Sequence, residues 1–478
     1  MTSHPTQPHV VIIGGGFGGL AAARALRKAP VRITLIDRRN HHLFQPLLYQ
    51  VATAALNPGD IAYPIRGALA KQKNARVLLA DARSIDVAAR RVELDGGALT
   101  YDYLIVATGA THSYFGKPWE ERAPGLKSIE DALEIRRRVF LAYEAAEREA
   151  DPAAQKAWLT FVVVGGGATG VELAGALGEI GLHTLAHDFR RIDSTTVRVL
   201  LVEGRDRVLP GFAPESSAAA QKALEKRHVE VRTGAIVTDI DDGGVTIATG
   251  SGDAKVSTRI EARTVLWAAG VQASPLARTL NVPLDRSGRV EVGADLAIPG
   301  HPEVFVIGDL AKMSFGADAK GAGGVAKEVP GVAQGALQSG AYVGAAIARE
   351  VRGDRAPRAA FRYNDKGSMA TIGRAQAVVE IGRMKRSGFF AWLFWWVIHV
   401  MYLVGFRNRF AVMFQWMWSY LTFQRGARLI TGPVGALPPV SGLDASGSPS
   451  LPAAAETVAL DARADGTAER AAAEDKAS

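Results

Sequence analysis

Two glycine-rich motifs of the form G-x-G-x-x-G lie far apart in the chain. Their glycines are Gly14, Gly16 and Gly19 in the first motif and Gly165, Gly167 and Gly170 in the second. In such a motif the first glycine permits a tight turn, the second lets the backbone approach a pyrophosphate, and the third lets a helix pack closely on a strand. The helix that follows supplies amide donors to the phosphates. The spacing therefore predicts two dinucleotide-binding sites in one chain.

An acidic residue follows each motif at the distance expected for a ribose ligand. Asp37 lies 23 residues after Gly14, and Glu203 ends the corresponding strand of the second unit. A carboxylate there accepts hydrogen bonds from ribose hydroxyls, and it repels a 2′-phosphate. Glu203 therefore favours NADH over NADPH, although Arg205, two residues further on, weakens that distinction.

The segments around each motif predict the elements that position it. A short apolar run before the glycines has the pattern of a buried parallel strand, and a helical pattern follows them. The predicted strand, helix and strand are 10–13, 19–27 and 31–36 in the first unit, and 161–164, 171–180 and 197–202 in the second. Each unit is therefore a βαβ motif, and the pair predicts a domain repeat.

The rest of the chain predicts an α/β fold with two Rossmann-like dinucleotide-binding domains and a C-terminal membrane-binding helical segment. A strand at 304–307 ending in Gly308-Asp309 and a helix at 331–351 indicate that the chain returns to its first domain after the second. The predicted divisions are 9–120 with 289–365 for the first dinucleotide-binding domain, 121–288 for the second, 366–432 for the membrane-associated segment, and 433–478 for a disordered tail.

The composition excludes several kinds of redox protein. The 478 residues include no cysteine, which rules out disulfides, thiolate-ligated zinc and cysteine-ligated iron–sulfur clusters. No metal site is predicted. The first nine residues lack the apolar core of a signal peptide, so secretion is not expected.

The charge of +8 is concentrated near the C-terminus. Between 381 and 432 there is no Asp or Glu, and the segment holds seven cations and five of the eight tryptophans. The cations are Arg383, Lys385, Arg386, Arg407, Arg409, Arg425 and Arg428. Nucleic-acid binders also combine cations with aromatics, but they lack uninterrupted apolar runs. We therefore expect residues 383–428 to contact an anionic lipid surface, and we expect no nucleic acid.

The manner of membrane attachment leaves three interpretations open. Residues 388–406 carry no formal charge over 19 positions, which is just enough to span a bilayer core of about 30 Å. His399 interrupts this run, basic residues flank it, and a second aromatic run follows at 410–423. Two helices lying in the membrane interface explain these features best. A spanning helix and a buried dimer interface are the less favoured alternatives.

Five short segments resemble the two-dinucleotide-binding flavoprotein superfamily. They are the two glycine motifs, Ala107-Thr108-Gly109, Ala268-Ala269-Gly270 and Val306-Ile307-Gly308-Asp309. The resemblance implies that the first domain holds FAD, that Thr108 and Gly109 mark a crossing between domains, and that Asp309 faces the FAD ribityl chain. It also implies that Gly270 lies at a cofactor site. A simpler interpretation of Asp309 is a helix N-cap, which is compatible with the ribityl role.

Residues 333–340 resemble the A-Q-x-A-x-Q-x-G signature of type II NADH:quinone oxidoreductases. The resemblance implies that Gln334 and Gln338, one helical turn apart, offer their amides to quinone carbonyls beside the flavin. It also implies that Gln45 and Pro46 lie close to the isoalloxazine, and that Glu172 lies near nicotinamide and flavin. The alternatives are glutamines that only cap or solvate a helix, and a first-turn acid stabilised by the helix dipole.

The resemblance implies electron transfer from NADH through FAD to a membrane quinone, without proton pumping. It further implies monotopic attachment to the cytoplasmic face of the inner membrane and a possible homodimer. Two alternatives stay open: an NADH-dependent reductase of a soluble carrier such as ferredoxin or rubredoxin, and an NADH-sensing flavoprotein with little turnover.

Overall fold

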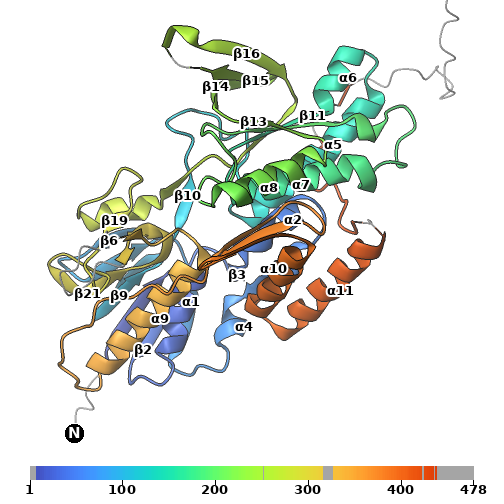
Figure 1. Ribbon diagram of the computed structural model, residues 1–478. Coiled ribbons are helices and arrows are strands. Elements are labelled where there is room, and N and C mark those ends of the chain that lie inside the picture. The colour runs from blue at the N-terminus through green and yellow to red at the C-terminus, as the bar shows by residue number, and fades with distance from the viewer. Residues whose placement is uncertain (1–6, 251, 316–326, 423–424, 435–436, 439–478) are drawn as a thin grey trace, which may run out of the picture.

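The computed structural model describes residues 7–250, 252–315, 327–422, 425–434 and 437–438. Most of the tail at 433–478 that we predicted to be disordered lies outside these described residues. The described chain is built around two larger sheets flanked by helices, followed by a small three-stranded C-terminal sheet and two helices (Figure 1). The prediction of an α/β fold with two Rossmann-like units is therefore confirmed.

The first sheet is built from two distant parts of the chain. Its order is β20-β21-β9-β1-β2-β5. Its elements are β1 (His9–Ile13), β2 (Arg32–Asp37), β5 (Ala75–Leu79), β9 (Tyr103–Val106), β20 (Ala297–Ile298) and β21 (His301–Val306). β21 pairs in parallel with β9, so the strand after the second unit does return to the first sheet.

Two helices pack side by side on this sheet. They are α1 (Phe17–Ala25) and α9 (Ala333–Glu350), and Figure 1 shows them together beside the strands. Glycine permits the close approach: a Cβ at Gly340 would lie 2.2 Å from the Gly18 carbonyl oxygen, and one at Gly344 would lie 2.7 Å from the Ala22 carbonyl oxygen. The turn before α9 is thereby held against the first glycine motif.

The second sheet is parallel and has the order β13-β12-β11-β17. Its strands are β11 (Thr160–Val164), β12 (Arg198–Val202), β13 (Val229–Arg232) and β17 (Thr264–Trp267), and its helices include α5 (Ile129–Arg148), α7 (Ala168–Glu179) and α8 (Pro214–Glu225). An antiparallel sheet of β14 (Ala235–Asp241), β15 (Gly244–Thr249) and β16 (Val256–Glu261) extends from it. The two units are joined by β10 (Ala110–His112) paired with β18 (Val271–Ala273).

The C-terminal segment begins with a meander and ends with two helices. The strands are β25 (Ser368–Thr371), β26 (Ala377–Ile381) and β27 (Met384–Gly388), and the helices are α10 (Phe389–Tyr402) and α11 (Phe406–Thr422). Figure 1 shows α10 and α11 packed next to each other at one side of the molecule. Among the described residues, no helix has both the length and the apolarity that a membrane crossing requires.

The interpretation of residues 388–406 as one spanning helix is therefore wrong. The helical conformation is interrupted between α10 and α11, where Gly405 adopts a φ of +94°. α10 has only 14 residues, and at 1.5 Å per residue it covers about 21 Å, short of a bilayer core.

One side of the helix pair is buried and the other is exposed. Trp395, Leu403, Val412 and Trp416 join the same hydrophobic core as α2 (Leu48–Ala52) and α7. The outer side chains, each between 39% and 80% exposed, are Phe389, Phe390, Leu393, Phe394, Val397, Met401, Tyr402, Phe410, Phe414, Met417 and Trp418. We call these eleven side chains the apolar face.

Not every cation of this segment faces outward, which corrects part of the lipid prediction. Arg425 is buried; it donates to the Thr53 carbonyl at 2.8 Å and to Glu179 at 3.3 Å. Arg428 forms an ion pair with Asp188. These guanidinium groups stabilise contacts within the protein because each is bound to another part of the chain, so they are not available to lipid.

Candidate functional site

A cavity of about 930 Å³ lies between the two units and helix α10. Its size is at the upper end of the range for ligand pockets. The predicted site residues that line it are Gly14, Gly16, Asp37, Gln45, Pro46, Thr108, Gly109, Glu172, Gly270, Asp309 and Gln334. The predicted residues that do not line it are Gly19, Gly165, Gly167, Gly170, Glu203 and Gln338. The first nucleotide site and the far end of the second therefore open into one space.

The glycines of the first motif have different physical roles. Gly14 has a φ of +105°, and a Cβ there would lie 2.4 Å from the Ala107 carbonyl oxygen. A Cβ at Gly19 would lie 1.8 Å from the Gly14 carbonyl oxygen, whereas one at Gly16 would meet nothing within 4 Å. The outer glycines thus permit the turn itself, and Gly16 leaves open the space where a pyrophosphate would approach the backbone.

The second motif repeats this geometry. A Cβ at Gly170 would lie 1.8 Å from the Gly165 carbonyl oxygen, Gly165 has a φ of +108°, and a Cβ at Gly167 would meet nothing within 4 Å. The same backbone shape at two places fits two dinucleotides.

The two predicted ribose acids are held in matching positions. Asp37 accepts hydrogen bonds from the Gly15 amide at 2.6 Å and the Arg39 amide at 2.7 Å. Glu203 accepts from the Gly166 amide at 2.5 Å and the Arg205 amide at 2.9 Å. Each carboxylate is therefore bound to its own glycine turn beside the open side of the motif.

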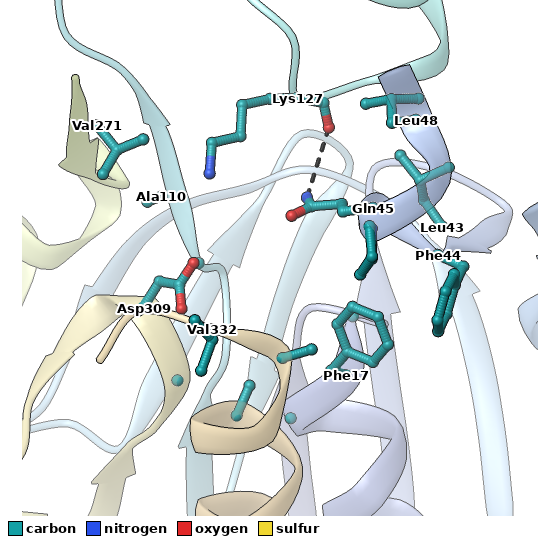
Figure 2. Close-up of a pocket in the computed structure, with 18 of the residues that line it drawn as sticks. Phe17, Leu43, Phe44, Gln45, Leu48, Ala110, Lys127, Val271, Asp309 and Val332 are labelled. Carbon is teal, nitrogen blue, oxygen red and sulfur yellow. Dashed lines mark hydrogen bonds between the residues drawn. The ribbon is translucent and has the colours of Figure 1, made fainter. Parts of the chain in front are cut away.

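Asp309 and Thr108 provide polar groups at the floor of the cavity. Figure 2 shows the Asp309 carboxylate pointing into the space below Lys127. The N-cap of its short turn, Gly308–Leu310, is Ile307, so the interpretation of Asp309 as an N-cap is wrong. The Thr108 hydroxyl is buried and has no hydrogen-bond partner among the described residues. Both observations fit a polar cofactor, because a buried hydroxyl without a partner is costly.

Gln45 and Phe44 lie on the opposite wall. The Gln45 amide donates to the Lys127 carbonyl oxygen at 3.5 Å, a contact that Figure 2 marks. Phe17 and Phe44 meet edge to face with their centroids 5.7 Å apart. Pro46 follows in a 3-10 turn, Gln45–Leu47. This wall is therefore aromatic and apolar, with one amide near its rim, and it suits a flat ring system.

Glu172 is a buried carboxyl group on α7. The helix begins at Ala168 and has no acidic residue in its first turn, so the alternative of a dipole-stabilised first-turn acid is wrong. The Thr371 backbone amide donates a hydrogen bond to the Glu172 carboxyl group at 3.3 Å. Burial raises the pKa of Glu172 to about 8, and the hydrogen bond from Thr371 opposes this only partly. The group therefore carries a proton at neutral pH, and it lines the cavity.

The structure separates the two predicted glutamines. Gln334 lies in the first turn of α9 and lines the cavity. Gln338 turns to the backbone of Asn364 instead: it donates to the carbonyl at 2.9 Å and accepts from the amide at 2.8 Å. The prediction that both amides face the flavin therefore fails for Gln338, because both ends of its amide are already bound.

His399 is a site residue that the sequence reasoning missed. It lies on α10, lines the cavity, and stacks on Trp395 with 4.1 Å between ring centroids. Its Nδ1 is 2.7 Å from the Trp395 carbonyl oxygen, so Nδ1 donates and Nε2 is the acceptor. Burial lowers the pKa of His399 to about 4, which keeps the ring neutral. The available signal was a lone histidine within an aromatic run, which from the sequence alone is interpreted only as an interruption of the uncharged segment 388–406.

The comparisons with known proteins agree with this arrangement. Residues 8–340 match the pyridine nucleotide-disulphide oxidoreductase family, and residues 366–425 match the NDH2 C-terminal domain. A type II NADH:quinone oxidoreductase of Mycobacterium tuberculosis, Ndh, is 48% identical over 441 residues, covering 90% of this chain and 92% of that protein. The chain belongs to the type II NADH:quinone oxidoreductase family.

Other members of the type II family are more distant. One from Staphylococcus haemolyticus is 30% identical over 377 residues, covering 77% of this chain and 88% of its own. The solved structure of NDH2 from Plasmodium falciparum in complex with NADH matches with a TM-score of 0.79 at 20% identity. The match covers 89% of this chain and 100% of the Plasmodium chain, and at this sequence identity it is evidence for the fold only.

Proposed function

We propose that this chain oxidises NADH and reduces a membrane quinone by two electrons, with FAD as the bound cofactor and without proton pumping. The observation that carries the proposal is the single cavity in which the first glycine motif, Glu172 of the second unit and His399 of α10 all take part. A nucleotide-binding turn, a proton-bearing carboxyl group and a helix with an exposed apolar face therefore line the same cavity.

The FAD would be held by residues of the first unit. Gly14 and Gly16 leave the turn open to a pyrophosphate, Asp37 receives the ribose hydroxyls, and Thr108 and Asp309 face the ribityl chain. Gly109, Gln45 and Pro46 border the ring. Bound FAD supplies the chemistry that the side chains lack, because it accepts a hydride and passes electrons on. The residues themselves bind, orient and exclude water.

NADH would be held by the second unit in the same way. Gly165 and Gly170 form the turn, Gly167 leaves room for the pyrophosphate, and Glu203 receives the adenosine ribose. Gly270 lines the cavity at the end from which the nicotinamide would reach the flavin.

The quinone would enter the cavity past α10. Phe394, Ile398, His399 and Tyr402 line the cavity, and Phe394 and Tyr402 also belong to the apolar face. A long apolar tail could therefore remain in lipid while the ring lies among Gln334, Glu172 and His399. The neutral Gln334 amide donates to a quinone carbonyl without trapping a charge.

The apolar face supports monotopic attachment, and the cytoplasmic surface of the inner membrane is proposed on family resemblance alone. Aromatic and aliphatic side chains on one side of two short helices are typical of an interfacial helix pair. Arg383 and Arg386 are exposed just before α10, whereas Lys385 pairs with Glu215. We retain an anionic lipid surface as the partner of this region. A homodimer is proposed on family resemblance alone. The divisions at 9–120 with 289–365, 121–288 and 366–432 remain proposed domain limits.

Anaerobic rapid mixing tests the proposed function. NADH should bleach the flavin absorbance of the purified protein, and a quinone analogue should restore it, whereas oxidised ferredoxin or rubredoxin should not. Restoration by the soluble carrier but not by the quinone would favour the alternative reductase. A stably bleached flavin with either acceptor would favour an NADH sensor.

A further inference from the structure

A second, smaller cavity lies behind the wall of the first. Its volume is about 90 Å³. The residues that bound it include Tyr49, Gln50, Ala55, Glu179, Trp395 and Arg425. One water needs on the order of 10–15 Å³ of such space and two or more polar partners, so this cavity suits several waters. The buried indole nitrogen of Trp395 has no hydrogen-bond partner among the described residues, and a water would supply one.

Tyr49 lines both cavities and connects them by hydrogen bonds. The Gln50 amide donates to the Tyr49 hydroxyl at 2.9 Å, so that hydroxyl is free to donate to the Thr371 hydroxyl, also at 2.9 Å. Thr371 then donates its amide to Glu172 at 3.3 Å. The Tyr49 and Thr371 hydroxyls are therefore bonded to each other, and Thr371 contacts the buried carboxyl group through its backbone amide.

The reaction needs such a connection. Reduction of a quinone to a quinol takes up two electrons and two protons, whereas oxidation of NADH to NAD⁺ delivers two electrons and one proton. One proton per turnover must therefore come from solvent. Glu172 is buried and lines the first cavity, which the proposed FAD and NADH would fill, and water that enters from the quinone side would have to pass the apolar side chains of α10.

We propose that the second cavity is the proton inlet of the quinone site, and that Tyr49 and Thr371 pass protons from its water to Glu172. The proposal rests on the proposed function. In the step, the O–H bond of Glu172 breaks as an O–H bond forms on the quinone oxygen, and the carboxylate is left with one negative charge. The Thr371 hydroxyl then turns from Tyr49 toward the carboxylate and gives its proton to Glu172, Tyr49 gives its own to Thr371, a water of the second cavity gives one to Tyr49, and a proton from solvent restores that water.

A largely buried network of charged groups borders the second cavity. Glu179 accepts from Arg227 at 3.0 Å and from Arg425 at 3.3 Å, and it also accepts from the Arg374 amide. This ion network holds α7 and the C-terminal segment together around the cavity. Among the described residues, Tyr49 lines this cavity and its hydroxyl is bonded to that of Thr371, the residue that contacts Glu172.

The test separates the two halves of the reaction in Tyr49→Phe and Thr371→Val variants. Thr371→Val keeps the backbone donor to Glu172 and removes only the hydroxyl. In both variants NADH should bleach the flavin within twofold of the wild-type rate, whereas reoxidation by a short-chain quinone should slow at least tenfold. The ratio of reoxidation rates in H₂O and D₂O should also rise. Tyr143→Phe is the matched control, because Tyr143 is buried on α5 and lines neither cavity.

A second readout does not depend on turnover. The carboxyl stretch of Glu172, assigned in the infrared spectrum by its loss in Glu172→Gln, shifts when the proton is replaced by deuterium. After transfer of the resting protein to D₂O, this shift should take at least ten times longer in Tyr49→Phe and Thr371→Val than in the wild type. Ala55→Leu, which narrows the second cavity from its half-buried rim, should slow the shift as well.

The outcomes distinguish this proposal from the proposed function. If Glu172→Gln slows reoxidation by quinone but neither Tyr49→Phe nor Thr371→Val does, the inlet is overturned and the function stands. Equal slowing in Tyr143→Phe would also overturn the inlet, because the effect would then be structural. If no quinone reoxidises the wild type, the proposed function itself fails.

Discussion

At the scale of single residues, Glu172 shows how burial sets protonation. The carboxyl group has lost its water, and one backbone donor replaces it only in part, so the pKa rises from 4.5 to about 8. Because the folded protein holds this proton more tightly than the unfolded chain, the free energy of unfolding falls as pH rises between these two values. Each pKa unit corresponds to about 1.4 kcal/mol.

Glu172→Gln should therefore change the pH dependence of stability. The variant has no proton to lose, so its melting temperature relative to the wild type should rise steadily from pH 5 to pH 8. Thermal unfolding of both proteins, followed by circular dichroism at several pH values without NADH, measures the difference. A difference that is constant with pH would show that Glu172 is ionised in the folded protein.

The two glutamines should respond differently to the same substitution. Gln334→Leu should slow reoxidation of the flavin by quinone at least tenfold, since it removes the amide that lines the cavity, and should leave reduction by NADH nearly unchanged. Gln338→Leu removes both hydrogen bonds to Asn364 and should instead lower the free energy of unfolding by roughly 1–3 kcal/mol, which lowers the melting temperature. Half-reaction kinetics and thermal unfolding of both variants check this, and the reverse pattern would contradict it.

Glu203 should determine the preference for NADH. Glu203→Ala removes the acceptor for the ribose hydroxyls and the repulsion of a 2′-phosphate, so the ratio of kcat/KM for NADH to that for NADPH should fall at least tenfold. Steady-state rates with both nucleotides measure it. An unchanged ratio would show that Glu203 only supports the Gly166 turn, to which it is bound.

At the scale of elements, the strand–turn–helix units divide their glycines between folding and binding. Gly170→Ala should destabilise the protein by several kcal/mol, because its Cβ would lie 1.8 Å from the Gly165 carbonyl oxygen. Gly167→Ala should leave the melting temperature of the NADH-free protein unchanged and weaken NADH binding at least tenfold, because its Cβ would enter only the open side of the turn. Thermal unfolding and NADH titration distinguish them, and equal loss of stability in both would refute this division.

At the scale of the whole molecule, the C-terminal helices act both as part of the core and as a surface. Trp395 and Trp416 pack in the core with α2 and α7, and Trp416 donates to Gln50 on α2. Deleting the segment would therefore remove core side chains together with the apolar face. Substitution on the exposed side alone is the sharper experiment.

Phe390→Ser combined with Phe414→Ser should weaken membrane binding without unfolding the protein. These rings are 80% and 61% exposed, so the folded state loses little. A buried phenylalanine contributes roughly 1.5–3 kcal/mol, and two of them should change partitioning on the order of a hundredfold. Sedimentation with anionic vesicles in high salt measures it. Leu79→Ser, 59% exposed on the first sheet, is the control, and an equal loss in that variant would contradict the assignment of the apolar face.

The local chemistry of the chain was sufficient to predict much of this protein. The glycine motifs, Asp37 and Glu203 were recognisable because a tight turn and a ribose acid depend on residues close together in sequence. The two C-terminal helices were predictable from the distribution of aromatic and basic residues, because that distribution reflects contact with a membrane interface rather than packing against particular residues. These features needed no knowledge of the packing.

The tertiary structure alone decided which polar groups reach the site and which are already bound. Gln338 and Gln334 share a spacing that predicts one face, yet Asn364, 26 residues further on, binds only Gln338. Arg425 has the same charge as the other cations of its segment, but it is buried because it binds Thr53 and Glu179, which lie 372 and 246 residues earlier in the sequence. His399 and Glu172 acquire their pKa shifts only when distant segments close over them. Desolvation depends on what surrounds a group in space, and the sequence pattern does not contain that.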